Sequence, residues 1–309
     1  MTTRTETRTA AVGLLPTSAH GARRSGALAW VLVLLAVGMA VASLLGPVGV
    51  GAMTYRTSPT SLNQLRGSDA ATLFLIAPLA LAAAALAWRR HRAAPLLATG
   101  IGAYALYSYA QVVIGQEYLR LPGNVERFFP LLLGVFVLAG GAVVLGQRAT
   151  PATLPALSAG MARLVGIVLL CVAAFLVLGL HLPSMVTAWQ DPSSMTEYAS
   201  SPTPFWMIKL MDLGIIVPVA VATGVGLLRG APWAMRVMYP LLTAYACLGT
   251  SVAAMGLVMV LRDDPDASVF LLGGFIGFAL LFAALTSAAY RPLFQRPLEV
   301  APAGAVGPR

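Results

Sequence analysis

The chain has 309 residues, of which 58% are hydrophobic and only 10% are charged, and its mean hydropathy is +0.82. A soluble domain has about 25% charged residues, so this composition excludes an ordinary soluble protein and predicts an all-α bundle of transmembrane helices. The net charge of +9 does not indicate nucleic-acid binding, because no basic run is interleaved with aromatic residues. Arg-rich cytoplasmic loops explain the excess better.

Two tails, two groups of apolar segments and a linker are expected along the chain. Residues 1–26 are rich in Thr, Arg, Ser and Gly and predict a disordered cytoplasmic tail, and 291–309 form a second tail. Eight apolar segments lie between them, each near the ~20 residues that cross a bilayer. Their expected bounds are about 27–48, 70–88, 94–115, 130–147, 162–182, 210–228, 233–261 and 267–290. Four fall in 27–148 and four in 162–290, with a cytoplasmic linker at 149–161.

The first apolar segment has an alternative interpretation. Arg23 and Arg24, an apolar run and then Ala40-Val41-Ala42 resemble a cleavable secretion signal. Cleavage would leave three helices in one group and four in the other, so we interpret the segment as a retained helix.

The two groups carry the same spaced motif. Ser58-Pro59-Thr60 precedes Arg66 and Asp69, and Ser201-Pro202-Thr203 precedes Lys209 and Asp212 at the same spacing, which gives a period near 143 residues. Pro78 to Arg89 and Pro218 to Arg229 match as well, as do Tyr104 and Tyr245 between alanines. Repeats of four helices cross the membrane in the same direction, so a 4+4 parallel tandem repeat is predicted.

The distribution of basic residues predicts the orientation. Six of the 20 fall on one side, namely Arg56, Arg66, Arg120, Arg127, Lys209 and Arg262, and the other fourteen fall on the side of the termini. The positive-inside rule then places both termini in the cytoplasm. Nineteen of the basic residues are Arg, a bias typical of high-GC bacteria, and the expected location is a bacterial plasma membrane.

The Arg66–Asp69 and Lys209–Asp212 pairs are the leading candidates for a substrate-binding site. Each pair is three residues apart, so the side chains share a helix face and can form an ion pair. One interpretation is a cap that marks where a helix enters the bilayer. The other is a functional carboxylate inside the membrane, favoured for Asp212 because its neighbours are apolar.

The third segment and its loop add further candidates. Tyr104, Tyr107 and Gln111 share one face, and Glu117 follows without an aligned counterpart in the second repeat. They predict either a polar wall of an outward vestibule or an interfacial aromatic belt. Trp206 and Tyr245 complete the candidate set. Pro78 and Pro218 lie within helices and predict kinks.

No metal or cofactor is predicted. Cys171 and Cys247 lie in separate apolar segments without metal-binding spacing. His181 with Met185, Met195, Met207 and Met211 could suit Cu(I), but no tight Met or His spacing occurs, and packing explains the methionines better. Nucleotide, dinucleotide, serine-hydrolase and zinc-protease motifs are also absent from the sequence.

The Asp–Pro signatures and the Tyr-rich third segment resemble a group of eight-helix integral membrane proteins of high-GC bacteria. The resemblance rests on Asp69 to Pro78, Tyr104 to Tyr107 and Asp212 to Pro218, and covers about residues 55–290. It implies no activity, and it implies only that these polar positions recur as a set.

Three functions remain open from the sequence. The first is a small permease or channel-like protein, in which Asp69 and Asp212 bind protons or a cationic substrate. The second is an intramembrane enzyme that uses Asp212 or Glu117 as a general acid on a lipid or isoprenoid. The third is a sensor, or a subunit that assembles with another membrane protein. The lipid bilayer is the one partner common to all three.

Overall fold

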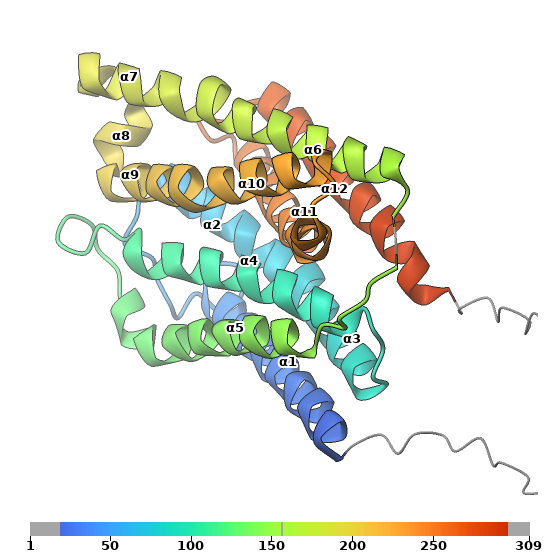
Figure 1. The fold of residues 1–309 in the computed structure, drawn as a ribbon. Helices are drawn as coiled ribbons and strands as arrows, with labels where there is room; N and C mark the ends of the chain where they lie inside the picture. Colours follow the sequence, from blue (N-terminus) through green and yellow to red (C-terminus); the bar gives the residue numbers. More distant parts are fainter. Residues whose placement is uncertain (1–18, 156, 296–309) are drawn as a thin grey trace, which may run out of the picture.

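The computed structural model describes residues 19–155 and 157–295, and all regular structure in these residues is helical (Figure 1). Eight of its helices are long and apolar enough to cross a bilayer, so the chain is a multi-pass membrane protein. The predicted tails lie largely outside the described residues. The linker at 149–161 is described except for residue 156, and it connects the fourth and fifth spans.

Several of the eight spans are built from consecutive helical elements, and all eight follow in chain order. They are α1 (Ala19–Leu45); α2 (Pro59–Ala71), η1 (Thr72–Ile76) and α3 (Ala77–Trp88); α4 (Ala94–Ile114); η2 (Val125–Phe128) and α5 (Phe129–Ala149); α6 (Ala159–Ala174), η3 (Phe175–His181) and α7 (Leu182–Gln190); α9 (Pro202–Met211), η5 (Asp212–Ile216) and α10 (Val217–Leu228); α11 (Pro232–Leu261); and α12 (Val269–Phe294). Two short elements, η4 (Pro192–Ser194) and α8 (Thr196–Ser200), connect α7 to α9.

The second and sixth spans begin well before the expected residues 70 and 210. They begin at Pro59 and Pro202, because proline suits the first turn of a helix, and in the second span the Ser58 hydroxyl accepts the Ser61 N–H as a cap. The first turns of α2 contain polar residues such as Asn63, so the pattern of apolar residues does not predict them. The fifth span likewise continues to Gln190 instead of ending near 182.

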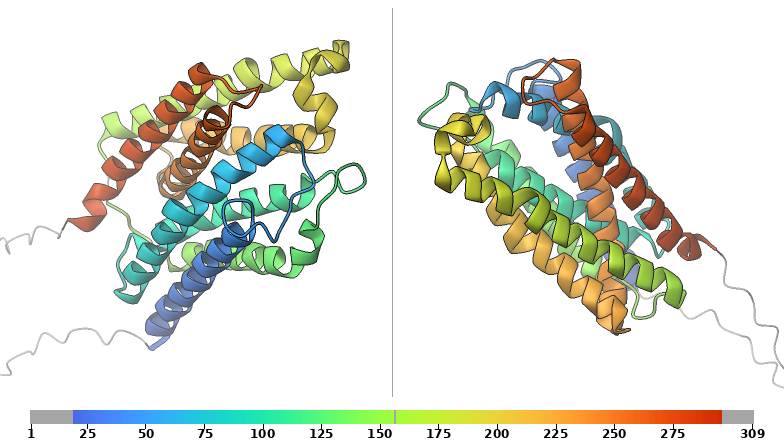
Figure 2. Two further views of the ribbon diagram at one scale, coloured as in Figure 1. Left: turned by 180° about the vertical axis from the view of Figure 1, so that it is seen from behind. Right: turned by 90° about the horizontal axis from the view of Figure 1, so that it is seen from above.

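The helices of each half pack mainly with one another, and three helix pairs make the most extensive contacts between the halves. In the first half α1 packs on α3 and α5, and α4 packs on α5. In the second half α6 packs on α10, and α11 packs on α12. Between the halves, α11 packs on α2 and α4, and α9 packs on α4 (Figure 2). Helix α4 therefore lies between the helices that carry Asp69 and Asp212.

Glycines allow the closest helix contacts. A Cβ at Gly67 of α2 would lie 2.4 Å from the backbone of Ala254 in α11. Gly166 and Gly224 join α6 to α10 in the same way, since a Cβ on either would come within 3.0 Å of the other's carbonyl oxygen. Close backbone approach at small residues is how helices gain packing energy in a bilayer, where burial from water gives little.

The two ends of the bundle differ. The α7–α9 connection and the loops that precede α2 and α5 gather at one end, which we call the loop end, and the described chain termini lie at the other, the terminal end (Figure 1). At the terminal end the turns after α3 and α10 have matching hydrogen bonds, from His91 N–H to Leu86 O and from Ala231 N–H to Gly226 O. Each turn needs a left-handed residue, Arg90 (φ 53°) or Gly230 (φ 67°).

Candidate functional site

Asp69 and Asp212 lie inside their helices rather than at the helix starts. Each follows the first helical residue, Pro59 or Pro202, by ten positions, or about 15 Å of helix. The favourable effect of a helix N-terminus on a carboxylate is confined to the first turn. The cap interpretation is therefore wrong for both aspartates.

Asp212 is held by side chains from two other helices. Its Oδ1 accepts a short hydrogen bond from the Tyr107 hydroxyl of α4, and its Oδ2 lies 2.8 Å from His181 Nε2 at the end of η3. Asp212 is 8% exposed and His181 is 2% exposed. A buried carboxylate requires such partners, because charge removed from water is expensive unless it is paired and hydrogen-bonded. We call these three residues the Asp212 cluster.

The described residues contain three π-helical turns, of which one begins at Asp212 and one ends at His181, and a proline follows each turn. The N–H groups of Ala77, Leu182 and Val217 each donate to the carbonyl five residues earlier, at Thr72, Val177 and Asp212. The next residue in each case is a proline, Pro78, Pro183 or Pro218. Proline has no N–H and its ring collides with the carbonyl four residues before it, so the helix widens locally. The kinks expected at Pro78 and Pro218 thus take the form of π turns.

Asp69 has a different set of partners in the first half. Its carboxylate accepts from the Tyr55 hydroxyl at 3.2 Å and from the Ser43 hydroxyl at 3.5 Å. Gly46 makes room for it, since a Cβ there would lie 2.8 Å from Asp69 Oδ2. Tyr55 belongs to the loop before α2, where burial and the nearby Asp69 charge raise its pKa well above the usual value. The phenol therefore stays protonated and able to donate.

Helix α4 carries buried tyrosines on two of its faces. Tyr107 bonds Asp212, and the Tyr109 hydroxyl donates to Met39 O in α1 at 3.5 Å. Two residues correspond to about 200° around a helix, so the two side chains leave opposite faces. Tyr104, also buried, lies 3.4 Å from the Thr72 hydroxyl. Gln111 lies one turn beyond Tyr107 on the same face of α4.

The expected ion pairs with Arg66 and Lys209 do not form. Arg66 Nη1 donates to Asn63 at 3.0 Å, while its buried Nε has no hydrogen-bond partner among the described residues. Lys209 is 6% exposed, and its Nζ lies 3.2 Å from the centroid of the Phe205 ring. The aspartates are bound instead by hydroxyl and imidazole groups.

Glu117 joins the two halves at the loop end. Its Oε1 accepts the Thr203 N–H of α9 at 2.7 Å, and its Oε2 lies 3.6 Å from Arg120. Asp264, in the loop after α11, has the corresponding role for α2, because its carboxylate accepts from Thr60 and Asn63 at 3.0 and 2.7 Å. Glu117 lacks an aligned counterpart, yet Asp264 makes the equivalent contact.

The remaining candidates lie around the Asp212 cluster without touching its carboxylate. The Tyr245 hydroxyl donates to Ile216 O in η5 at 3.0 Å. Trp206 stacks on Trp189 with ring centroids 6.4 Å apart and also lines a surface groove of about 540 Å³. This groove lies between α4 and α9 and is bounded by Ile114, Pro202, Thr203, Trp206, Met207 and Leu210. The candidate residues therefore do not converge on one site, because Asp69 and Asp212 have separate sets of partners.

His181 is a member of the cluster that the sequence does not predict as a partner of Asp212. The sequence suggests a candidate metal ligand there, whereas the imidazole binds Asp212. One sequence feature links His181 to the aspartate helices. It lies two residues before Pro183, and the other two π turns also end two residues before a proline. In the described part of the chain, no group of three or more His, Cys, Asp or Glu side chains could hold a metal ion.

No family model, curated protein or solved structure matches this chain.

Proposed function

We propose that the protein is a proton-coupled permease for small cationic or amphipathic substrates, with Asp212 as its proton-carrying group. The observation that carries the proposal is the hydrogen bond between Asp212 and His181 inside apolar transmembrane helices. Carboxylate and imidazole groups within spanning segments are typical of proton relays in pumps and transporters.

The hydrogen bonds of the Asp212 cluster suit a proton switch. The ionised Asp212 carboxylate only accepts hydrogen bonds, whereas a protonated carboxyl group also donates one. Protonation of Asp212 removes its charge and alters its bonds to both Tyr107 and His181. Since these residues come from α4, η3 and η5, one proton changes contacts among three helices and across the two halves. Proton binding can then bias the arrangement of the halves, which coupled transport requires.

A tandem repeat supports the permease proposal. Ser58 and Ser201 hold the same place in the two motifs, and the Ser58 N–H donates to the Ser201 hydroxyl at 3.3 Å. Equivalent residues touch one another only near an axis that relates the halves. The matching turns at Arg90 and Gly230 and the π turns before Pro78 and Pro218 follow the same correspondence. We infer a 4+4 parallel repeat, in a plasma membrane with both termini cytoplasmic.

The groove beside Trp206 favours an amphipathic substrate over a purely hydrophilic one. It opens on the exposed side of α4 and α9, the helices that bring Tyr107 and Asp212 together. A molecule dissolved in the outer part of the bilayer could enter between them. Trp206 offers an aromatic face to a cation there.

Proteoliposomes test the proposal without a known substrate. Uptake of a panel of lipophilic cations, including tetraphenylphosphonium and ethidium, is measured with and without an imposed pH gradient. We expect gradient-dependent uptake that Asp212→Asn abolishes.

The matched control is Asp191→Asn. Hydrogen bonds, the largest from Ser193, hold the pKa of the exposed Asp191 below its usual range, so this substitution also removes one negative charge at the loop end. Uptake that ignores the pH gradient, or that survives Asp212→Asn, would contradict the proposal. Turnover of a lipid in detergent without a gradient would favour an intramembrane enzyme instead.

A further inference from the structure

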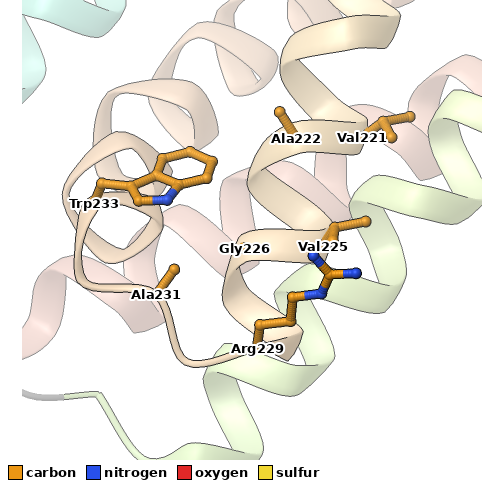
Figure 3. Close-up of a pocket in the computed structure, with 7 residues that line it drawn as sticks. All are labelled: Val221, Ala222, Val225, Gly226, Arg229, Ala231 and Trp233. Carbon is orange, nitrogen blue, oxygen red and sulfur yellow. The ribbon is translucent and has the colours of Figure 1, made fainter.

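A second groove lies at the terminal end of the bundle, on the exposed side of α10. It has a volume of about 500 Å³ and is lined by Val221, Ala222, Val225, Gly226, Arg229, Ala231 and Trp233 (Figure 3). We call it the Arg229 groove. It shares no residue with the Asp212 cluster, although its first lining residue, Val221, follows Asp212 by nine positions on the same span.

Small residues shape the Arg229 groove. A Cβ at Gly226 would lie 2.9 Å from Trp233 Cζ2, so glycine lets the indole approach α10. Gly230 at φ 67° allows the tight turn that brings Trp233 to this place. From Val221 to Arg229 the groove follows α10 for about 12 Å. One leaflet of hydrocarbon is about 15 Å thick. The length of the groove along α10 is therefore close to the span of one acyl chain.

Arg229 is the charged residue of the groove. Figure 3 shows its side chain turning back along α10 toward Val225. Among residues 19–155 and 157–295, no carboxylate lies within ion-pair distance of it. The turn after α3 differs, because Arg92 there donates to the carbonyl oxygens of Pro292, Leu293 and Gln295 at 2.7–2.8 Å. The end of α12 thus supplies oxygen acceptors to one turn, while the Arg229 turn faces an open groove.

We propose that the Arg229 groove binds an anionic phospholipid. The guanidinium would take two phosphate oxygens, the geometry in which arginine binds phosphate most strongly. One acyl chain would lie against Val221 and Val225, and Trp233 would occupy the headgroup level, where tryptophan is enriched. The lining has a cation and no carboxylate, so it complements a net-negative headgroup and provides no ion-pair partner for the ammonium of a zwitterionic lipid.

The test compares lipid affinities of the purified full chain in neutral detergent. Binding of phosphatidylglycerol and of phosphatidylcholine with identical acyl chains is followed by native mass spectrometry. We expect the wild type to prefer phosphatidylglycerol. Arg229→Gln should weaken phosphatidylglycerol binding about fivefold or more. Ala222→Phe, which fills the groove without changing charge, should weaken it as well.

Arg148→Gln is the matched control, because Arg148 is exposed at the end of α5 and does not line the groove. Its affinity for phosphatidylglycerol should equal that of the wild type. Equal losses in Arg148→Gln and Arg229→Gln would overturn the site in favour of general surface charge. Unchanged affinity in Ala222→Phe, or full displacement of the lipid by glycerol phosphate, would also overturn it. Melting temperatures without lipid check that each variant is folded.

Discussion

Asp212 shows why a carboxylate can persist inside a membrane helix. Its two oxygens meet a hydroxyl and an imidazole from separate helices, and the three side chains satisfy one another. The sequence indicates that Asp212 is unusual, because it lies between apolar neighbours. Its partners lie 105 and 31 residues away, a distance over which sequence patterns carry no pairing information. Lys209, three residues away, was therefore the natural but wrong choice.

Asparagine at position 212 should separate stability from function. An amide has the shape of the carboxylate, can still accept from Tyr107 and can donate to His181. We expect Asp212→Asn to change the free energy of unfolding by less than about 1 kcal/mol. Asp212→Ala leaves Tyr107 and His181 without their hydrogen-bond partner and should lower the free energy of unfolding by about 2 kcal/mol. Thermal unfolding in detergent measures both. A large loss of stability in Asp212→Asn would indicate a structural role and favour an assembly subunit.

Replacement of Arg90 by glycine should stabilise the protein. It adopts the left-handed conformation that Gly230 adopts in the matching turn, and a side chain there is strained by roughly 1 kcal/mol. Arg90→Gly should therefore raise the melting temperature, and Gly230→Ala should lower it. A decrease with Arg90→Gly would show that the guanidinium contributes more than the strain removes.

At the scale of elements, the apolar segments predicted all eight spans but not their detailed course. The early starts of α2 and α9 were missed because their first turns are polar or contain prolines, although Ser58-Pro59 is a helix-start signal. The π turns were missed as well, since Pro78 and Pro218 predict a disturbance without specifying how the hydrogen bonds rearrange. That rearrangement matters, because it sets the direction of Asp212 and His181.

The contact between α2 and α11 gives a prediction for a single methyl group. Gly67→Ala would place a Cβ 2.4 Å from the backbone of Ala254, and backbone cannot move aside as a flexible side chain can. We expect a loss of about 2 kcal/mol or more. Gly134→Ala is the control, because no atom lies within 4 Å of the added Cβ and alanine is the better helix former. Equal effects on the melting temperature would contradict the packing of α2 against α11.

At the scale of the whole molecule, the two halves carry the same spaced motif but differ in their polar interiors. Asp69 and Asp212 hold matching positions, yet one is bound by Tyr55 and Ser43 and the other by Tyr107 and His181. The repeated spacing in the sequence predicts the matching positions. It does not predict the difference, because the partners of each aspartate lie outside the repeated motif. We infer that the second half, which has the imidazole, is the half specialised for proton exchange.

The contact between Ser58 and Ser201 allows the two halves to be locked together at the loop end. In a chain with Cys171 and Cys247 replaced by alanine, Ser58→Cys and Ser201→Cys should form a disulfide under oxidation, because the Ser201 side-chain oxygen already lies 3.3 Å from the Ser58 backbone nitrogen. Alternating access requires the halves to move relative to each other. We therefore expect oxidation to stop gradient-driven uptake and a reductant to restore it.

A cross-link inside one half controls for this experiment. Thr54 and Asn124 both precede spans of the first half, and Asn124 Oδ1 accepts from the Thr54 N–H at 2.8 Å. Thr54→Cys with Asn124→Cys should cross-link as readily yet leave uptake intact, since it joins parts of one half. Uptake that continues in the locked Ser58–Ser201 pair would mean that transport needs no separation at the loop end. Equal inhibition by both pairs would place the moving parts within the first half rather than between the two.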